Sequence, residues 1–146
     1  GNAVLSWISK NTSFENKQIV IYGESLGSGV AVELGTKSKF LSIVLEAPFM
    51  SIPEVAQKWY KIFPTKYLVK DKFDNYSKID KIKSPLLILS GKKDEIVPHQ
   101  HSIQLLEKAK VNKKGVFIDE AIHNNLYDFG IEKDVIAFNL ELWQLI

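Results

Sequence analysis

Residues 23–27 read Gly-Glu-Ser-Leu-Gly and place Ser25 between two glycines, directly after the apolar run 19–22. A serine at a sharp turn from strand to helix is typical of a nucleophile elbow, in which the backbone is strained and the hydroxyl is exposed. Glycine is expected at both flanks, Gly23 and Gly27, because a side chain there would collide with neighbouring backbone. The simpler interpretations are a glycine-rich turn with a capping serine and a fragment of a phosphate-binding loop.

Two further side chains could activate this serine. A serine hydroxyl is a poor nucleophile until an adjacent base, oriented by a third group, removes its proton. Asp94 follows the apolar run 85–91, and His123 follows a further strand-like segment at 115–119. The order serine, acid, histidine is the one expected of a hydrolase that carries a G-x-S-x-G elbow. The sequence therefore predicts that Ser25, Asp94 and His123 form a catalytic triad.

The elements needed to position these residues alternate along the chain. We expect strands at four apolar runs and helices in the segments between and around them: strands at 19–22, 41–49, 85–91 and 115–119, helices at 2–10, after Ser25, after Pro98 and at 131–146. This alternation predicts an α/β fold with a parallel sheet covered by helices on both faces. Polar residues would then gather beyond the carboxyl ends of the strands, where such sheets bind ligands. The first strand is wholly apolar, which favours burial on both of its faces.

Composition limits the possible functions. The chain has 146 residues, a net charge of +2, no cysteine and, among its 19 basic residues, no arginine. It is a single domain in size. The weak charge and the lack of bidentate guanidinium groups argue against a nucleic-acid partner. Without cysteine there is no disulfide or thiolate metal site, and no apolar run is long enough to span a bilayer. We therefore expect a cytoplasmic protein, with association with a membrane surface as the alternative.

Four segments together resemble the α/β-hydrolase superfamily: YGESLGSG, LEAPF, PLLILSGKKDEIVP and AIHNNL. The chain is most similar to the membrane-associated serine hydrolases of the abhydrolase-domain type, which include depalmitoylase-like members. This resemblance implies that Ser25 is the nucleophile, His123 the general base and acid, and Asp94 the group that orients the imidazole. It also implies that the Leu26 N–H is an oxyanion donor, and that a small-molecule or lipid acyl substrate is cleaved with no cofactor or metal.

The early position of the serine indicates a partial domain. The resemblance implies that residues 1–146 hold only the equivalents of strands 5 to 8, the C-terminal half of an α/β-hydrolase. The loop that supplies the second oxyanion donor would lie in the other half. The first strand would expose an unpaired edge, so we expect a homo-oligomer or pairing with a separate N-terminal half. A non-catalytic half-hydrolase that acts by association, and a peptidase of the same fold, remain alternative functions.

Other acidic residues compete with Asp94 for the third position. Glu46 ends the second predicted strand and could be the acid of the triad, but we favour Asp94 for that position. The pair Asp119 and Glu120 precedes the histidine and is typical of a solvated strand end. Asp128 is more typical of a helix cap than of a catalyst.

Two histidines invite a metal interpretation. His99 and His101 are spaced so that they would lie on opposite faces of a helix, which disfavours shared coordination. His101 could instead line the entrance of the site, because its segment follows Asp94.

The segment from about 50 to 84 separates the second and third strands and is expected to form a small helical cap. It carries eight lysines and three aspartates, with six aromatic residues among them: Trp59, Tyr60, Phe63, Tyr67, Phe73 and Tyr76. One interpretation is an acyl-chain groove or a surface that approaches an anionic membrane. The other, which we favour from the sequence, is a helical excursion with aromatic residues in its core and solvated lysines.

Overall fold

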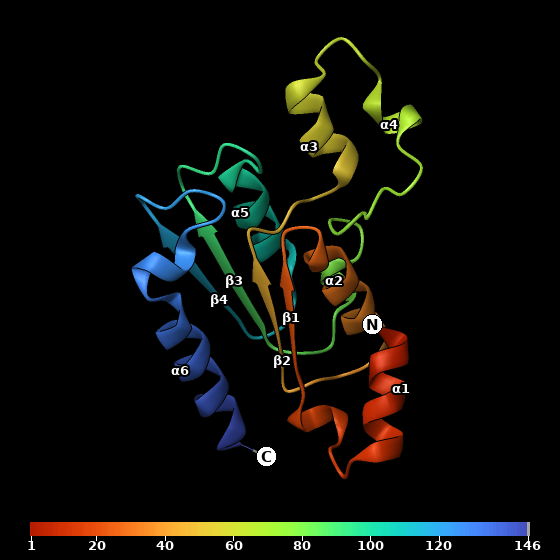
Figure 1. The fold of residues 1–146 in the computed structure, drawn as a ribbon, viewed down its shortest axis with the longest axis vertical. Coiled ribbons are helices and arrows are strands. Elements are labelled where there is room, and N and C mark those ends of the chain that lie inside the picture. Colours follow the sequence, from red (N-terminus) through yellow and green to blue (C-terminus); the bar gives the residue numbers. More distant parts are fainter. Residues whose placement is uncertain (146) are drawn as a thin grey trace.

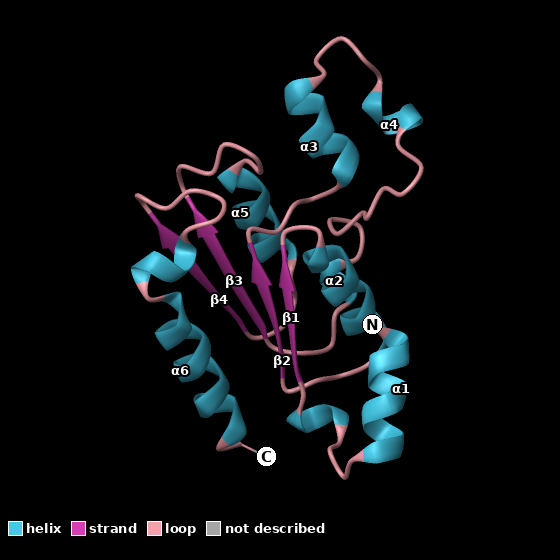
Figure 2. Cartoon of the chain, in the orientation of Figure 1, coloured by secondary structure: helices cyan, strands magenta, loops and turns pink. Residues whose placement is uncertain are grey.

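The structure is a computed structural model that describes residues 1–145, with the backbone alone at Lys66. Strands and helices alternate, as the sequence predicts (Figures 1 and 2). The strands are β1 (Val20–Glu24), β2 (Ser42–Glu46), β3 (Leu86–Gly91) and β4 (Lys113–Ile118). The helices are α1 (Asn2–Asn11), α2 (Gly27–Lys37), α3 (Ile52–Trp59), α4 (Thr65–Leu68), α5 (His99–Lys108) and α6 (Ile131–Trp143), with short 3₁₀ helices at Asn16–Gln18, Ile79–Lys81 and Leu126–Phe129. Within the described residues, no helix is long and apolar enough to cross a membrane.

The four strands form one parallel sheet in the order β1-β2-β3-β4. Helices α2 and α5 pack on one face through Val32 and Leu105, against Ile43 and Ile88 of the central strands. Helix α6 packs on the other face through Phe138 and a neighbouring leucine. The prediction of an α/β fold with a parallel sheet covered by helices is confirmed.

The two central strands are buried at every position, but β1 is not. It forms the edge of the sheet, where Tyr22 is 38% exposed and Glu24 is also exposed. The expectation of a strand buried on both faces is therefore wrong for β1. Its apolar residues are those of a central strand, and within residues 1–145 no strand pairs with its outer edge.

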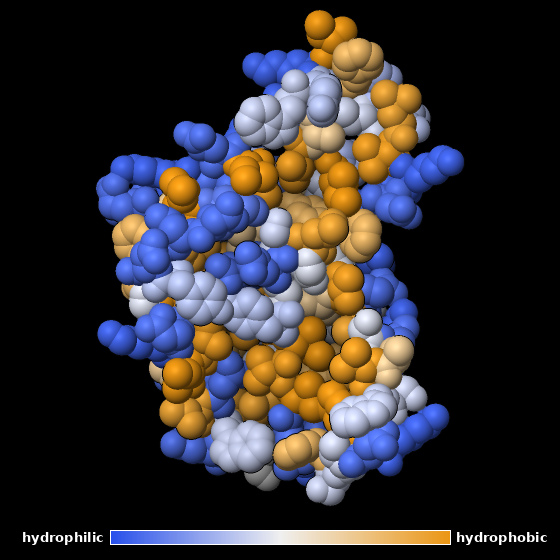
Figure 3. Space-filling model, viewed as in Figure 1, coloured by the Kyte–Doolittle hydropathy of each residue, from blue (hydrophilic) through white to orange (hydrophobic). Residues whose placement is uncertain are grey.

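An exposed apolar patch lies over the sheet between α6 and α1 (Figure 3). Part of it is a hollow of about 370 Å³ lined by residues of β1, α6 and the chain before β2: Val20, Leu41, Val135, Ile136, Asn139, Leu140 and Trp143. Leu140 is 56% exposed and Trp143 is 47% exposed. This surface is too large and too apolar to be an ordinary scatter of surface residues.

The excursion at 50–84 contains two helices that project beyond the carboxyl edge of the sheet (Figure 1). Ser51 directly precedes α3 as its N-cap, and its Oγ accepts a hydrogen bond from the Glu54 N–H; Pro53 lies in the first turn of the helix. Both are start signals of a helix. The aromatic side chains do not form the core that we favoured from the sequence. Four of them, Trp59, Tyr60, Phe63 and Tyr67, are 58–85% exposed.

Candidate active site

Ser25 occupies a strained turn between β1 and α2. Its φ is +46°, in the left-handed region that non-glycine residues rarely adopt. Backbone bonds hold it there: its N–H donates to Glu46 O at 2.8 Å, and its carbonyl accepts from Ser28 N at 3.0 Å and Ser28 Oγ at 2.6 Å. The structure thus has the elbow geometry that the sequence predicts, and the strain lies where a nucleophile would be exposed.

The two glycines of the elbow differ in what they avoid. A Cβ on Gly23 would lie 2.6 Å from Gly27 O and 2.8 Å from the Ala31 Cβ, so only glycine lets the strand pass α2 this closely. A Cβ on Gly27 would meet nothing within 4 Å. The expected collision is confirmed at Gly23 and wrong at Gly27, where the helix leaves open space.

The structure brings Ser25, His123 and Asp94 into one hydrogen-bonded chain. Ser25 Oγ lies 3.1 Å from His123 Nε2, and His123 Nδ1 lies 2.6 Å from Asp94 Oδ2. The second carboxylate oxygen of Asp94 accepts the N–H groups of Ile96 and Val97, each at 2.8 Å. With a carboxylate facing Nδ1, the neutral ring carries its proton there, and Nε2 is free to accept the serine proton.

Electrostatics favour the protonated form of this histidine. The hydrogen bond to Asp94 raises the pKa of His123, burial opposes that rise, and the charges of Asp94, Glu24 and Glu46 add to it. His123 and Asp94 are 7% and 8% exposed. A buried imidazolium beside a carboxylate is the state that forms when a base takes a proton from serine.

The remaining predicted contact is the Leu26 N–H. It belongs to the residue directly before α2, whose side chain is 56% exposed. Among the described residues it donates no hydrogen bond, so it is free for an oxyanion at the start of the helix. Its role as an oxyanion donor stays a prediction.

The competing acids lie elsewhere. Glu46 is 2% exposed, and its carboxylate accepts a hydrogen bond from the Tyr22 hydroxyl instead of from the histidine. Its pKa is raised, chiefly by burial. Asp119 and Glu120 form exposed ion pairs with lysines, as expected of a solvated strand end.

The remaining acid, Asp128, does not cap a helix as the sequence suggested. It is exposed within the 3₁₀ helix Leu126–Phe129. That helix begins after Asn125, and α6 begins after Gly130.

Neither of the other histidines is in a metal cluster. Within residues 1–145, no group of three or more His, Cys, Asp or Glu side chains could hold a metal ion. His99 Nδ1 lies 2.9 Å from Ser90 Oγ, and its ring packs edge-on against Phe117. His101 Nδ1 accepts the Met50 N–H at 3.3 Å, which ties α5 to the start of the excursion.

Two supports of the site were missed by sequence reasoning. Asn75 is 1% exposed, and its Nδ2 donates to Phe49 O at 2.9 Å and to Ser28 Oγ at 3.3 Å. Because Ser28 Oγ in turn donates to Ser25 O, the irregular segment by which the excursion returns to the sheet supports the elbow. A polar asparagine in the segment FDNYSK was the only signal, and it resembles any turn residue.

The second support links the histidine loop to the sheet. Tyr127 Oη donates to Tyr22 Oη at 3.4 Å, and Tyr22 Oη donates to Glu46. Tyr127 lies in the 3₁₀ helix that directly follows the loop of His123, so this chain of hydroxyls ties that loop to β1 and β2 on the α6 face. The pKa of Tyr22 is strongly raised by burial and by the Glu46 carboxylate.

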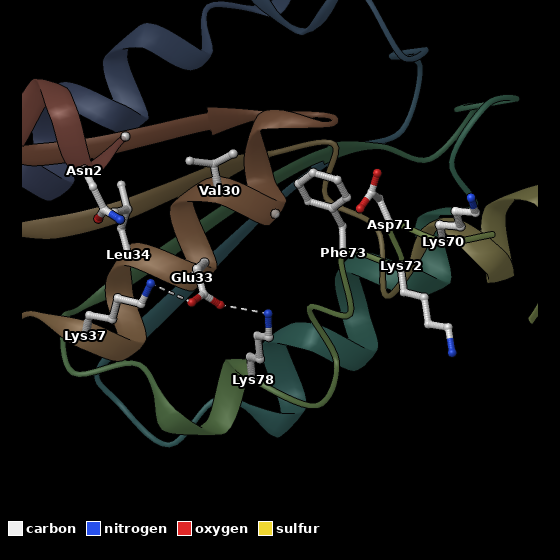
Figure 4. Close-up of a pocket in the computed structure, with 12 residues that line it drawn as sticks. Asn2, Val30, Glu33, Leu34, Lys37, Lys70, Asp71, Lys72, Phe73 and Lys78 are labelled. Carbon is white, nitrogen blue, oxygen red and sulfur yellow. Dashed lines mark hydrogen bonds and ion pairs between the residues drawn. The ribbon is translucent and has the colours of Figure 1, made fainter.

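A separate hollow of about 450 Å³ lies on the outer side of α2 (Figure 4). Glu33 stands beside it between Lys37 and Lys78, at 2.9 Å and 2.8 Å. These lysines lower the pKa of Glu33 to about 2. The hollow contains no residue of the hydrogen-bonded chain, and its charges are already paired or solvated.

Comparison with known proteins identifies the family. The sequence profile of the prolyl oligopeptidase family matches residues 2–125. The chain belongs to the prolyl oligopeptidase family. An uncharacterised protein of Mycobacterium tuberculosis (strain CDC 1551 / Oshkosh) is 32% identical over 136 residues, which cover 92% of this chain and 48% of the relative. Alpha/beta hydrolase domain-containing protein 17B of Homo sapiens is 30% identical over 129 residues, 86% of this chain and 43% of that protein.

Solved structures agree on the fold of this family member. An esterase of Pyrococcus furiosus has a TM-score of 0.73 at 22% identity, over 98% of this chain and 59% of the esterase. Acetyl xylan esterase 1 from Thermoanaerobacterium sp. has a TM-score of 0.74 at 19% identity, over 95% of this chain and 50% of the esterase. The resemblance to the α/β-hydrolase superfamily is confirmed. The chain spans about half the length of the curated relatives it matches.

Proposed function

We propose that this chain carries the reactive centre of a serine hydrolase that cleaves an ester, a thioester or a similar acyl bond. The observation that carries the proposal is the hydrogen-bonded chain Ser25–His123–Asp94, with the serine on a strained turn. Membership of a hydrolase-type family adds support.

The reaction follows from these positions. His123 Nε2 accepts the hydroxyl proton while Ser25 Oγ attacks the substrate carbonyl carbon, and the resulting oxyanion turns toward the Leu26 N–H. The imidazolium returns the proton to the leaving group, which leaves an acyl group on Ser25. Water then attacks this acyl-enzyme with the same histidine as base, and the acid is released. Asp94 holds the tautomer of the ring and stabilises its charge.

One donor of the oxyanion site is expected from outside this chain. In α/β-hydrolases the second N–H comes from a loop after an earlier strand. Removing one such donor typically slows turnover by a factor of about 10²–10³. We therefore expect the 146-residue chain to react with an activated acylating agent, yet to turn over unactivated esters slowly.

Peptide cleavage is the second candidate, because the family is named for an oligopeptidase. The same nucleophile would attack an amide, whose leaving group needs stronger general-acid assistance than that of an ester. Parallel assays with p-nitrophenyl esters, acyl thioesters and prolyl peptide anilides distinguish these substrates.

The first test is the intact mass of the chain after treatment with a fluorophosphonate. The proposal expects one adduct, absent in Ser25→Ala and retained in Ser13→Ala, which removes an exposed serine remote from the elbow. Asp94→Asn should slow adduct formation without abolishing it. No adduct on a folded wild-type chain would contradict the proposal and favour the alternative of a non-catalytic half-hydrolase that acts by association.

A further inference from the structure

Residues 59–68, which we term the cap tip, expose large apolar side chains at unusual density. Six of the ten are large apolar or aromatic residues that are 58–94% exposed: Trp59, Tyr60, Ile62, Phe63, Tyr67 and Leu68. They surround the turn between α3 and α4, the part of the molecule farthest beyond the carboxyl edge of the sheet (Figures 1 and 3). Such a concentration marks an interaction surface rather than scattered surface residues.

Hydrogen bonds hold the small two-helix unit together, and the unit still leaves these side chains exposed. Thr65 Oγ1 lies 2.8 Å from Pro53 O and 2.9 Å from Gln57 Oε1, which ties α4 to α3. Between the helices is a hollow of about 360 Å³ with a mainly apolar lining: Ala56, Tyr60, Phe63, Thr65, Leu68 and Val69. The two helices are thus tied together, and three of the exposed side chains, Tyr60, Phe63 and Leu68, line the open hollow between them.

Positive charge surrounds the apolar residues. Residues 52–72 contain five lysines and two acidic residues, a net charge of +3. Four of these lysines are exposed. Lys58 directly precedes the cap tip and Lys61 lies within it, while Lys70 and Lys72 lie in the chain that leads from the cap tip back toward α2. Lys58 Nζ donates to Glu95 O, which anchors α3 to the loop that carries Asp94.

We propose that the cap tip binds the interfacial region of an anionic lipid bilayer. Trp and Tyr prefer the membrane–water interface because one end of each side chain is apolar and the other polar. Ile62, Phe63 and Leu68 would reach the acyl region, while the surrounding lysines pair with anionic headgroups.

A protein partner fits this surface less well. Protein–protein interfaces are enriched in arginine and depleted in lysine. This chain has no arginine, and the charged residues within the cap tip, Lys61 and Lys66, are both lysines. The cap tip and the Ser25–His123–Asp94 chain lie beyond the same edge of the sheet, so a bound bilayer would face the site. This inference does not depend on catalysis.

The test is co-sedimentation of the full 146-residue chain with vesicles of phosphatidylcholine, alone or mixed with phosphatidylserine. We expect clearly tighter binding to the mixed vesicles. Lys61→Gln should weaken that binding about fivefold, since a lysine near an anionic surface is worth about 1 kcal/mol. This loss of vesicle binding in Lys61→Gln should become smaller at high salt, and Lys10→Gln on α1 should not change vesicle binding.

A matched pair of tryptophans tests the apolar contribution. Trp59 on the cap tip and Trp7 on α1 are both 61% exposed. We expect Trp59→Ser to weaken vesicle binding about tenfold or more and Trp7→Ser to leave it unchanged. Circular dichroism checks that both variants stay folded. Absence of vesicle binding, equal affinity for the two vesicle types, or equal losses in the two variants would overturn the proposal.

Discussion

Gly91 lies so close to Ala121 that a Cβ built on Gly91 would be 2.2 Å from the Ala121 carbonyl oxygen. Gly91 ends β3, just before Asp94, and Ala121 comes two residues before His123. The Lys93 N–H also donates to Ala121 O at 3.0 Å. The loops that carry the acid and the histidine are therefore packed backbone to backbone, which fixes the distance between their side chains.

The first prediction concerns this contact. Gly91→Ala should push the histidine loop away by a distance on the order of 1 Å and lower the rate of fluorophosphonate labelling of Ser25 by about 10²-fold. Gly115→Ala is the matched control, because Gly115 lies on β4 in register with Ile88 and its Cβ would meet side-chain atoms of Leu106 and Phe117 instead of backbone. Equal labelling rates in the two variants would show that the loop contact does not position the histidine.

The elbow glycines should differ in their tolerance of a methyl group. Gly23→Ala is expected to destabilise the chain by about 1–3 kcal/mol, because its Cβ would overlap Gly27 O and the Ala31 Cβ. Gly27→Ala has open space and starts a helix, where alanine is more favourable by up to about 1 kcal/mol. Urea unfolding of both variants measures the difference. A stable Gly23→Ala variant would contradict the close packing of β1 on α2.

Activity should depend on the ionisation of His123. Only neutral histidine accepts the serine proton, and hydrogen bonding to Asp94 raises its pKa, so the labelling rate should reach half its maximum above the ordinary histidine value of about 6.5. Asp94→Asn should move that midpoint to lower pH and slow the reaction by up to about 10⁴-fold. Glu46→Gln should move it the same way by less.

The stability of the folded chain should depend on pH in the opposite sense to the labelling rate. A pKa raised by folding means that the charged histidine stabilises the native state below the unfolded pKa, and that this contribution is lost as pH rises through the folded pKa. Thermal unfolding of wild type and Asp94→Asn across neutral pH tests this. A wild-type labelling midpoint below 6.5 would contradict both expectations.

Asn75 is predicted to support the elbow from a distance. Asn75→Ala removes the side-chain donor to the buried Phe49 carbonyl and to Ser28 Oγ. The loss should lower the free energy of unfolding by about 1–3 kcal/mol. Labelling of Ser25 should slow even at temperatures where the variant is folded. Asn2→Ala, at an exposed asparagine, should change neither quantity.

The sequence predicted those parts of the site that short local patterns mark. Apolar runs ended by glycine or proline located β2 and β3, and the polar residues after them located the reactive chain. The hydrogen bond of Glu46 depends on strand register, which local sequence does not set. The register places Glu24 opposite Glu46, and Tyr22, which donates to Glu46, lies two residues earlier on β1. The support from Asn75 depends on the path by which the excursion returns. The open space next to Gly27 could not be predicted either, because it depends on how neighbouring segments pack around the start of α2.

The excursion shows a different limit. Aromatic residues usually indicate a core, and lysines usually indicate solvent. The sequence therefore favoured buried aromatics, while the structure exposes Trp59 and Tyr67 because α3 and α4 are too short to enclose them. Composition alone cannot distinguish a small core from an amphipathic interaction surface.

The last prediction concerns the apolar patch over the sheet between α6 and α1, which β1 partly lines. The outer edge of β1 is unpaired within the described residues, and Leu140 and Trp143 lie exposed on the adjoining face. Edges and faces of this kind associate because pairing satisfies backbone groups and removes apolar area from water. We expect the purified chain to sediment at a mass above its 16.6 kDa. Leu140→Lys should shift it toward monomer.

Phe14→Lys is the matched control for that shift. Phe14 is 58% exposed, against 56% for Leu140, and it lies in the turn after α1. If the α6 face is the interface, the lysine at 140 places an unpaired charge inside it and association should weaken by tenfold or more, on the order of 1–3 kcal/mol. The lysine at 14 should leave association unchanged. A wild-type chain that sediments as a stable monomer, or equal shifts in both variants, would assign the exposed face no part in self-association.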